Sequence, residues 1–251
     1  MISHMEVISV PPTLIKYSGT PRVSMSNALA RSAQGLSLHE KRLLALCISK
    51  LDSGRHWTPE KLTVRVSISE YRKVFEIPHD KNVYSDLATA CSTLEERLIV
   101  FYDDKDKDVE HHVRWVGRTT YAKSKGWIEV VFFHELAPHL FKLRKQFTTY
   151  HLKQATALRT VYAWRLLELL MQFSSTGVVR ITLEAFWHAM EAPDSCRKSF
   201  KDLRRRIIEP AVSELKNRES LIISWRPKKT GRKVTSLEFS FDYDPQRVLN
   251  F

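Results

Sequence analysis

The sequence has little glycine and little cysteine, and each scarcity excludes a class of protein. Only 7 glycines occur among 251 residues, and none forms the GxxxxGK or GxGxxG pattern that cradles a nucleotide phosphate. The 3 cysteines, Cys47, Cys91 and Cys196, are odd in number and widely separated. Neither a disulfide framework nor a zinc knuckle is predicted. We expect reduced, buried thiols and no cofactor.

Long hydrophobic runs are also missing. Apolar runs such as Val130–Phe133 are far shorter than the roughly 20 residues that span a membrane. The first ten residues, MISHMEVISV, lack the cationic start and long apolar core of a secretory signal. With 43% hydrophobic and 27% charged residues, the composition is that of a soluble folded protein. We therefore predict a cytoplasmic protein with no membrane partner.

No enzymatic or metal site is recognised in the sequence. The stretch from His134 to His139 has three residues between Glu135 and the second histidine, whereas a zinc-protease helix has two, and Pro138 interrupts the turn. The adjacent His111 and His112 lack the apolar residue that separates the metal-binding histidines of strand-nicking initiators. No Ser/His/Asp set is evident, although triads can be hidden in sequence order. We predict a protein that is not an enzyme and binds no metal.

Positive charge is what the chain has in excess. It contains 40 Lys and Arg against 28 Asp and Glu, a net charge of +12. This balance favours a polyanionic partner, most commonly nucleic acid. Residues 195–235 alone hold 13 basic and 4 acidic side chains, a net charge of +9. Most of the excess lies in this segment, which we predict to contact DNA; the alternative is a solvated basic surface.

The predicted elements run in the same order in the two halves of the chain. The first half is expected to begin with a short strand or turn and a small helix capped by Ser26 (22–35), followed by a helix from Ser37 and a strand (62–66). A helix capped by Ser67 or Ser69 and ended by Pro78 comes next, and then a helix at 80–97. Strands are expected at 98–102, 113–122 and 127–133. In the second half we expect a helix (158–173), a strand (178–181), a helix capped by Thr182, a basic helix (197–217), and strands at 221–226 and 234–241.

Three pairs of segments align between the halves. RVSISEYRKVFEIP (65–78) mirrors RITLEAFWHAMEAP (180–193), YSDL (84–87) mirrors FKDL (200–203), and LIVFYDDKDKD (98–108) mirrors LIISWRPKKTG (221–231). The repeated order of helix, strand, helix, helix, strand, turn and strand is that of a winged helix. We therefore predict an α+β protein made of two tandem winged-helix (helix-turn-helix) domains related as a pseudo-repeat. Two unrelated small α+β domains are the alternative.

This duplication sets the predicted domains. Residues 1–21, with three prolines and one glycine, are expected to form a flexible arm. Residues 22–146 form the first winged-helix domain, which we expect to add auxiliary DNA contacts and to leave its sheet or wing free for protein contacts. Residues 147–251 form the second, which we expect to be the main DNA-binding domain.

The basic helix has one apolar face and one charged face. Its apolar positions, at ~100° per residue, fall in one sector: Phe200, Leu203, Ile207, Ile208, Ala211, Val212 and Leu215. Lys201, Asp202, Arg205 and Arg206 project elsewhere, whereas Arg204 falls inside the apolar sector, so we expect its stem to be packed. Pro210 is expected to kink the helix and to free one carbonyl. A DNA major groove, ~12 Å wide, admits one helix, and Arg reads guanine with two donors.

The two halves differ in charge. Pro227 to Lys233 form a basic turn that would act as a wing against the DNA backbone or minor groove. The corresponding turn of the first half, DDKDKDVE (103–110), is acidic, and its equivalent helix carries Lys81, Asn82 and Ser85. Residues 1–146 have a net charge of +5 and residues 147–251 a net charge of +7. We expect the second half to dominate DNA affinity.

Three stretches together resemble one family. SNALARSAQGLSLHEKRLLALCISKL (26–51), FKDLRRRIIEPAVSELKNR (200–218) and KKTGRKVTSLEFSF (228–241) are similar to patterns of the replication initiator (Rep) proteins of iteron-containing bacterial plasmids. The resemblance covers roughly residues 20–243, and only the combination of the three stretches is specific. The first wing varies within this family, so the acidic sequence of that turn in this chain takes little from the resemblance.

The resemblance implies a function. Such proteins bind short direct repeats (iterons) of double-stranded DNA at a plasmid origin as monomers through both winged helices, help to open adjacent DNA, and engage the host replication initiator and helicase. As dimers, joined through contacts of the first domain, they often repress their own gene at an inverted repeat. A transcriptional repressor without a replication role is the main alternative, and a nicking enzyme on a basic scaffold is a third.

The resemblance also implies which residues bind DNA. Arg205 is the expected base-reading residue, with Lys201 and Arg206 beside it and Asp202 as a weaker candidate. The expected phosphate or wing contacts are Lys198, Lys228, Lys229, Arg232 and Lys233. In the first half the expected contacts are Lys81, Asn82 and Ser85.

Overall fold

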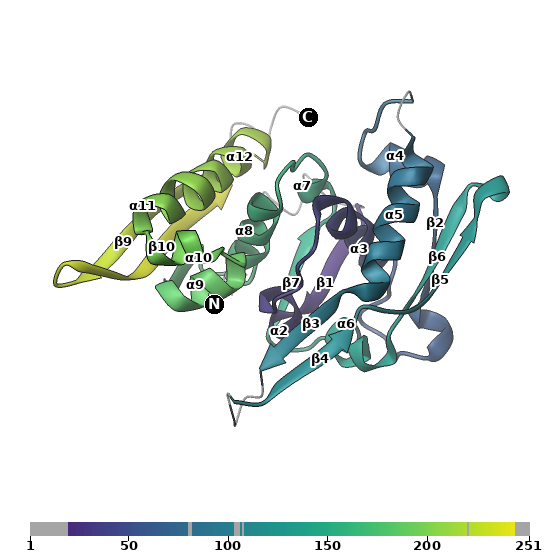
Figure 1. Ribbon diagram of the computed structural model, residues 1–251, viewed down its shortest axis with the longest axis horizontal. Coiled ribbons are helices and arrows are strands. Elements are labelled where there is room, and N and C mark those ends of the chain that lie inside the picture. The colour runs from purple at the N-terminus through teal and green to yellow at the C-terminus, as the bar shows by residue number, and fades with distance from the viewer. Residues whose placement is uncertain (1–19, 80–81, 103–105, 107, 220, 244–251) are drawn as a thin grey trace, which may run out of the picture.

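The computed structural model describes residues 20–79, 82–102, 106, 108–219 and 221–243. Almost all of the predicted arm at 1–21 lies outside the described residues, and so does Lys81. Within the described ranges the chain folds into two units, which are arranged along the long axis of the molecule (Figure 1).

The first unit is built on a three-stranded antiparallel sheet. Its strands lie in the order β2 (Thr63–Ser67), β6 (Trp127–Phe132) and β5 (Val116–Ala122). Three helices pack on this sheet or on each other: α3 (Leu38–Ser49), α4 (Ile68–Val74) and α5 (Val83–Glu96). α3 begins at a capping box, in which the Ser37 hydroxyl accepts from the Glu40 N–H and the Glu40 carboxylate accepts from the Ser37 N–H. The order α3-β2-α4-α5-β5-β6 confirms the predicted winged helix.

Further elements surround this first unit. β1 (Arg22–Ser26) leads into α2 (Asn27–Arg31), whose N-cap is Ser26 as predicted. β3 (Leu98–Tyr102) and β4 (Glu110–Arg114) pair as a separate two-stranded sheet. The remaining elements are the 3-10 helices η1 (Pro59–Leu62), η2 (Lys123–Lys125) and η3 (His134–Leu136), the short helices α6 (Ala137–Leu140) and α7 (Lys153–Thr156), and β7 (Phe147–His151).

The second unit repeats the same plan. α8 (Val161–Met171) precedes β8 (Val178–Thr182), α9 (Leu183–Met190), α10 (Asp194–Lys198), α11 (Phe200–Leu203), the π-helical turn η4 (Arg204–Ile208), α12 (Glu209–Glu219), β9 (Leu221–Thr230) and β10 (Lys233–Tyr243). The sheet order is β8-β10-β9, which corresponds strand for strand to β2-β6-β5. The predicted α+β fold of two tandem winged helices is confirmed.

The aligned motifs at 65–78 and 180–193 adopt the same local structure. Ser67 caps α4 and Thr182 caps α9, each by accepting from the N–H three residues ahead. Each motif also places a glutamate in the left-handed backbone region: Glu76 at φ 51° and Glu191 at φ 49°. A non-glycine residue is uncommon there, so its recurrence at the same motif position supports the duplication.

One predicted correspondence is wrong. The segment at 98–108 was aligned with 221–231, but β3 pairs with β4 outside the winged-helix sheet. The hairpin that corresponds to β9–β10 is β5–β6, because β6 lies at the centre of its sheet as β10 does. Short apolar strands followed by a polar turn look alike in sequence, and only the hydrogen-bonding partner distinguishes them.

The basic helix is less uniform than predicted. α10 ends at Lys198, and Ser199 is extended before it caps α11. The turn before Pro210 is π-helical, since the Glu209 N–H donates to the Arg204 carbonyl five residues back. Because proline has no N–H, this wider turn absorbs the irregularity that was predicted as a kink. The Arg204 side chain is 60% exposed, so the prediction of a packed stem is wrong.

The core runs through both units, with α8 between them (Figure 1). α8 contacts α2 and β7 on one side and α9 and α12 on the other, and residues 163–171 are all buried. The three cysteines are free and buried, as predicted. Burial raises the pKa of the Cys91 thiol to about 12 and that of Cys47 further, so both thiols are unreactive at neutral pH.

β7 bears on the boundary between the domains. It pairs antiparallel with β1, from Arg22 opposite His151 to Ser26 opposite Phe147. The boundary after residue 146 stays a prediction. The pairing of β7 with a strand of the first half favours a later boundary.

Candidate nucleic-acid interface

The helix formed by α11, η4 and α12 presents its basic side chains to solvent. Leu203, Ile207, Ile208, Ala211 and Leu215 are all at most 1% exposed, which anchors the opposite face. The predicted residues Lys198, Lys201, Arg205 and Arg206 are exposed and gather at the amino-terminal end of this helix. The structure therefore leaves these four predicted contacts accessible, with Lys198 at the end of α10 and the other three in the first turns of the following helix.

Arg205 is held in place by its own helix. Its side chain is 71% exposed, and its guanidinium lies 3.3 Å from the Asp202 carboxylate. Asp202 is half-buried, and its N–H donates to the capping Ser199 hydroxyl. In this arrangement Asp202 is a partner that orients Arg205. Arg206 donates to the Ser195 hydroxyl at 3.3 Å.

Arg204 differs from its two neighbours in its partners. Its Nε lies 2.7 Å from the Glu209 carboxylate, and its guanidinium carbon lies 5.8 Å from the centre of the Trp225 ring. These contacts join the helix to β9, so the expectation of a partly structural role fits the geometry even though the side chain is exposed.

The β9–β10 hairpin carries the second group of predicted contacts. Lys228, Lys229, Arg232 and Lys233 are all exposed. The predicted turn at 227–233 is shorter in the structure, because residues 227–230 continue β9. Gly231 at φ 60° makes the turn, and a side chain there would meet no described atom within 4 Å. The hairpin therefore ends in an open, basic tip.

Two arginines that the sequence analysis did not select lie at the root of this hairpin. Glu238 on β10 accepts from Arg180 at 3.0 Å and from Arg226 at 2.7 Å, and Lys228 lies 3.9 Å from it. Hydrogen bonds from Arg180 and Arg226 hold the pKa of the Glu238 carboxyl below its usual value. One carboxylate thus orders three cations on the exposed face of the sheet. The arginines come from different strands, which is why no local pattern indicated them.

Helix α5 of the first unit, which corresponds to the basic helix of the second, supports fewer of the predicted DNA contacts. Asn82 is the N-cap of α5, and its side-chain oxygen accepts from the Ser85 N–H at 3.2 Å. Both residues are exposed, but the Asn82 side chain is engaged in capping. Lys81 lies outside the described residues, so its role stays a prediction.

The first unit also has a basic hairpin that the sequence analysis missed. The turn between β5 and β6 contains Lys123, Ser124 and Lys125, followed by Gly126 at φ 67°. The acidic segment at 103–110 was predicted to be this wing, and that prediction is wrong because β3–β4 lies outside the sheet. The signal was present in the sequence: KSKG (123–126) resembles KKTG (228–231).

The root of the first hairpin repeats the carboxylate arrangement of the second. Glu129 on the central strand lies 2.9 Å from Arg65 on β2 and 3.9 Å from Arg118 on β5. Arg65 also stacks over the Trp127 ring, with its guanidinium carbon 3.9 Å from the ring centre. Both hairpins therefore have a glutamate at the centre of the sheet and arginines from the flanking strands.

The two basic hairpins project from opposite ends of the molecule (Figure 1). Each belongs to a unit that carries one helix of helix-turn-helix type, α5 or α11–α12. Such a pair can contact two separated segments of one duplex.

Other features that were weighed as possible sites have structural roles. His134 and Glu135 start a 3-10 helix, and the following Leu136, Ala137 and Leu140 are buried in the core, as predicted. His112 lies on β4 and is 3.2 Å from Glu110. Within the described ranges, no group of three or more His, Cys, Asp or Glu side chains could hold a metal ion. None of the helices in these ranges is both long and apolar enough to cross a membrane.

Comparison with known proteins gives consistent matches. Residues 22–171 match the family described as "Initiator Replication protein, WH1", and residues 182–241 match "Initiator Rep protein, WH2". The chain is 27% identical over 234 residues to a "Replication initiation protein" of Escherichia coli, covering 90% of this chain and 71% of that protein. It is 26% identical over 225 residues to an "Uncharacterized 27.6 kDa protein" of Escherichia coli, covering 86% of this chain and 93% of that protein.

A solved structure shares the fold. It is described as "Crystal structure of Pi initiator protein in complex with iteron DNA", with a TM-score of 0.78 and 18% identity over 90% of this chain and 98% of that chain. At this level of identity the likeness shows the arrangement of the two winged helices.

Proposed function

Because the chain belongs to the initiator replication protein family, with a WH1 and a WH2 domain, we propose that it initiates plasmid replication by binding direct repeats at an origin. In this function each unit contacts one segment of the repeat. The observation that carries the proposal is the duplicated arrangement of one exposed helix and one basic, glycine-tipped hairpin at each end of the molecule.

The second unit supplies the main sequence-reading surface. The first turns of a helix in the major groove reach base edges, and flanking Lys and Arg side chains bind phosphates. We assign base contacts to Arg205, with Lys201 and Arg206 beside it. Lys198 and the hairpin residues Lys228, Lys229, Arg232 and Lys233 contact the DNA backbone. Arg180 and Arg226 at the root of the hairpin extend this basic surface.

The first unit supplies a second, weaker contact. Its hairpin residues Lys123 and Lys125 contact phosphates, in place of the acidic segment first expected to be the wing. Ser85 in the first turn of α5 is a further candidate, and so is Lys81, which lies outside the described residues. Together the two units give one protein a footprint longer than either half can cover.

The same proposal includes the protein's partners and its mode of action. We propose that it works in the bacterial cytoplasm without catalytic activity of its own, helps to open the origin, and engages the host replication initiator and helicase. We also propose that a dimer, joined through the first domain, represses the protein's own gene.

Binding to origin repeats is the direct test. In gel shifts, the protein is expected to bind DNA carrying the direct repeats of its own origin more tightly than scrambled DNA of equal length and composition. Specific binding is typically 10³–10⁷ times tighter than non-specific binding, so the difference is expected to be large. Equal affinity for the two DNAs would refute sequence-specific origin binding.

A transcriptional repressor is the second candidate, favoured by the same DNA-binding surfaces. A plasmid-maintenance assay separates the two functions. Under the proposal, a plasmid with the origin replicates only when the protein is supplied. Repression of a reporter without support of replication would favour the repressor.

Lys228→Ala tests the hairpin of the second unit. If Lys228 contacts a phosphate, its loss is expected to reduce the slope of log K against log salt concentration by about one unit. The measurement is fluorescence anisotropy on one repeat at several salt concentrations. Lys153→Ala is the control, since Lys153 is exposed, pairs with Glu76 and belongs to neither hairpin. An unchanged slope for Lys228→Ala would contradict a phosphate contact.

A further inference from the structure

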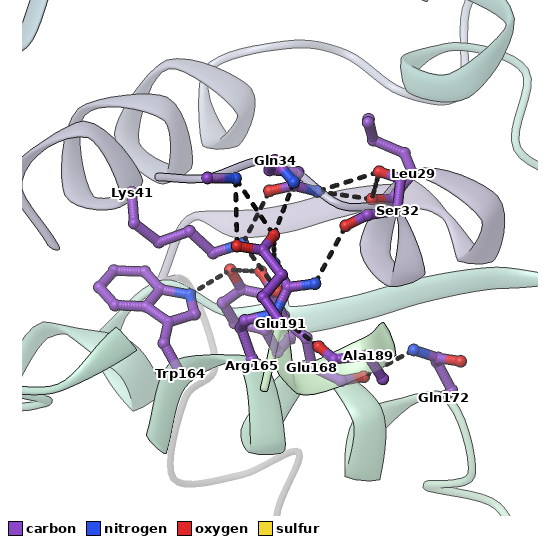
Figure 2. Close-up of polar contacts among 12 residues, drawn as sticks. Leu29, Ser32, Gln34, Lys41, Trp164, Arg165, Glu168, Gln172, Ala189 and Glu191 are labelled. Carbon is purple, nitrogen blue, oxygen red and sulfur yellow. Dashed lines mark hydrogen bonds and ion pairs between the residues drawn. The ribbon is translucent and has the colours of Figure 1, made fainter. Parts of the chain in front are cut away.

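A single carboxylate links the second unit to the first. Glu191, at the end of α9, accepts from the Gln34 N–H at 2.6 Å and from the Gly35 N–H at 3.1 Å (Figure 2). It also lies 2.7 Å from the Arg165 guanidinium. Gln34 and Gly35 lie within the stretch that matches WH1, and Glu191 lies within the stretch that matches WH2.

Arg165 completes the link from the middle of α8. Its side chain is 2% exposed, and its guanidinium donates to the Ser32 carbonyl at 3.0 Å and to the Ala189 carbonyl. Ser32 belongs to the loop after α2, and Ala189 belongs to α9. One buried guanidinium therefore bonds to the backbone of both units and to Glu191. We call Arg165 and Glu191, with these backbone partners, the joint.

A second buried network supports the joint from α3. Lys41 lies 2.8 Å from Glu168, with side chains that are 5% and 1% exposed. The other carboxylate oxygen of Glu168 accepts from the Tyr150 hydroxyl at 3.0 Å, and the Trp164 indole donates to that hydroxyl at 2.9 Å. Figure 2 shows both networks meeting around α8.

The joint has one low-energy geometry. Hydrogen bonds to charged groups are strong and directional, and a buried charge that loses its partner costs far more than an exposed one. Rotation of one unit against the other would separate Glu191 from the Gln34 and Gly35 N–H groups and would break the bonds of Arg165 to one of the two units. A buried ion pair adds little net stability compared with apolar packing, but removing one of its partners is strongly destabilising, so these contacts favour one orientation of the two units.

The glutamate of the motif at 180–193 links the two units, whereas its counterpart in the motif at 65–78 has a different partner. Glu76 occupies the same motif position as Glu191 and has nearly the same φ. Among the described residues its ion-pair partner is Lys153, at 2.8 Å, and the Glu76 and Lys153 side chains are 74% and 55% exposed. Glu76 therefore offers a matched control for Glu191 in the same chain.

We propose that the joint fixes the relative orientation of the two winged helices and thereby makes the spacing between their two DNA segments a determinant of specificity. This inference rests on the proposed function. Each added base pair moves one segment away by about 3.4 Å and rotates it by about 35° around the helix axis. A protein with a fixed joint cannot follow that rotation without losing the contacts of one unit.

The test compares Glu191→Ala with Glu76→Ala on two DNAs. One DNA carries the natural repeat, and the other carries one base pair inserted between the segments that footprinting assigns to the two units. For the wild type and Glu76→Ala, the insertion is expected to weaken binding strongly. For Glu191→Ala, the penalty of the insertion is expected to shrink by about tenfold, within the usual range of coupling between sites. An unchanged penalty in a folded Glu191→Ala protein would overturn the proposal.

Solution scattering of the protein alone keeps the test independent of DNA binding. Glu191→Ala is expected to show a broader distribution of interatomic distances than the wild type, with Glu76→Ala unchanged. If Glu191→Ala does not fold, Glu191→Gln, which keeps one acceptor oxygen, is measured instead. If the wild type shows no preference for the repeat, the proposed function fails, whereas identical scattering of wild type and folded variant overturns the joint itself.

Discussion

Replacing Arg205 by alanine is expected to weaken binding to the origin repeat by about 1–3 kcal/mol and to remove the preference for one base pair. The Arg205 guanidinium is exposed and is held 3.3 Å from Asp202, which limits the orientations that it samples. A pre-oriented guanidinium can offer two donors to guanine O6 and N7 at little cost in side-chain entropy. The loss of binding free energy is therefore expected to depend on the base at one position of the repeat.

The measurement is the dissociation constant on the repeat and on its single-base variants. For the wild type, all changes at the position that Arg205 reads are expected to weaken binding. Arg205→Ala is expected to bind equally tightly to the four repeats that differ in the base at that position.

Arg204→Ala is the matched control for Arg205→Ala. Arg204 is the preceding residue and is similarly exposed, but it is paired with Glu209 and lies over Trp225. Its loss is expected to leave the base preference unchanged. If Arg205→Ala weakens binding equally on every sequence, Arg205 contacts only phosphate.

The double substitution Lys123→Ala and Lys125→Ala is expected to reduce the salt slope by about two units and affinity by about 30-fold at 0.15 M salt. Both residues lie at the tip of the β5–β6 hairpin, which corresponds by sheet order to the β9–β10 hairpin. Each phosphate contact releases close to one counterion, so two contacts give this change. The base preference is expected to be unaffected.

The control for this pair lies on the neighbouring hairpin. Asp106 and Asp108 belong to the acidic segment between β3 and β4. If that segment faced DNA, Asp106→Asn with Asp108→Asn would increase affinity. We expect affinity and salt slope to stay unchanged in this variant. A double lysine variant that binds like the wild type would show that the first hairpin does not touch DNA.

Local sequence patterns predicted much of the fold correctly. Ser26 and Thr182 were identified as helix caps, because a capping hydroxyl and the first turn of a helix are adjacent in sequence. The repeated motif at 65–78 and 180–193 was identified for the same reason, since its strand, cap, helix and proline are all local features. The charged face around Arg205 followed from helical periodicity.

The long-range contacts could not be predicted in this way. β7 pairs with β1 across more than a hundred residues, and nothing in either strand specifies the other. Arg180 and Arg226 meet at Glu238 only because three strands align in one sheet. The roles of Asp202 as a partner of Arg205 and of Asn82 as a cap also became clear only from the positions of their side chains.

The sequence by itself determined the two-unit plan, the basic helix and the basic hairpin of the second unit, because charge and periodicity act within a few residues. Only the tertiary structure decided which hairpin is the wing of the first unit and how Glu191 and Arg165 hold the two units together. Strand pairing and buried ion pairs join residues that are distant in sequence, and their free energy depends on the geometry and burial that the complete fold creates.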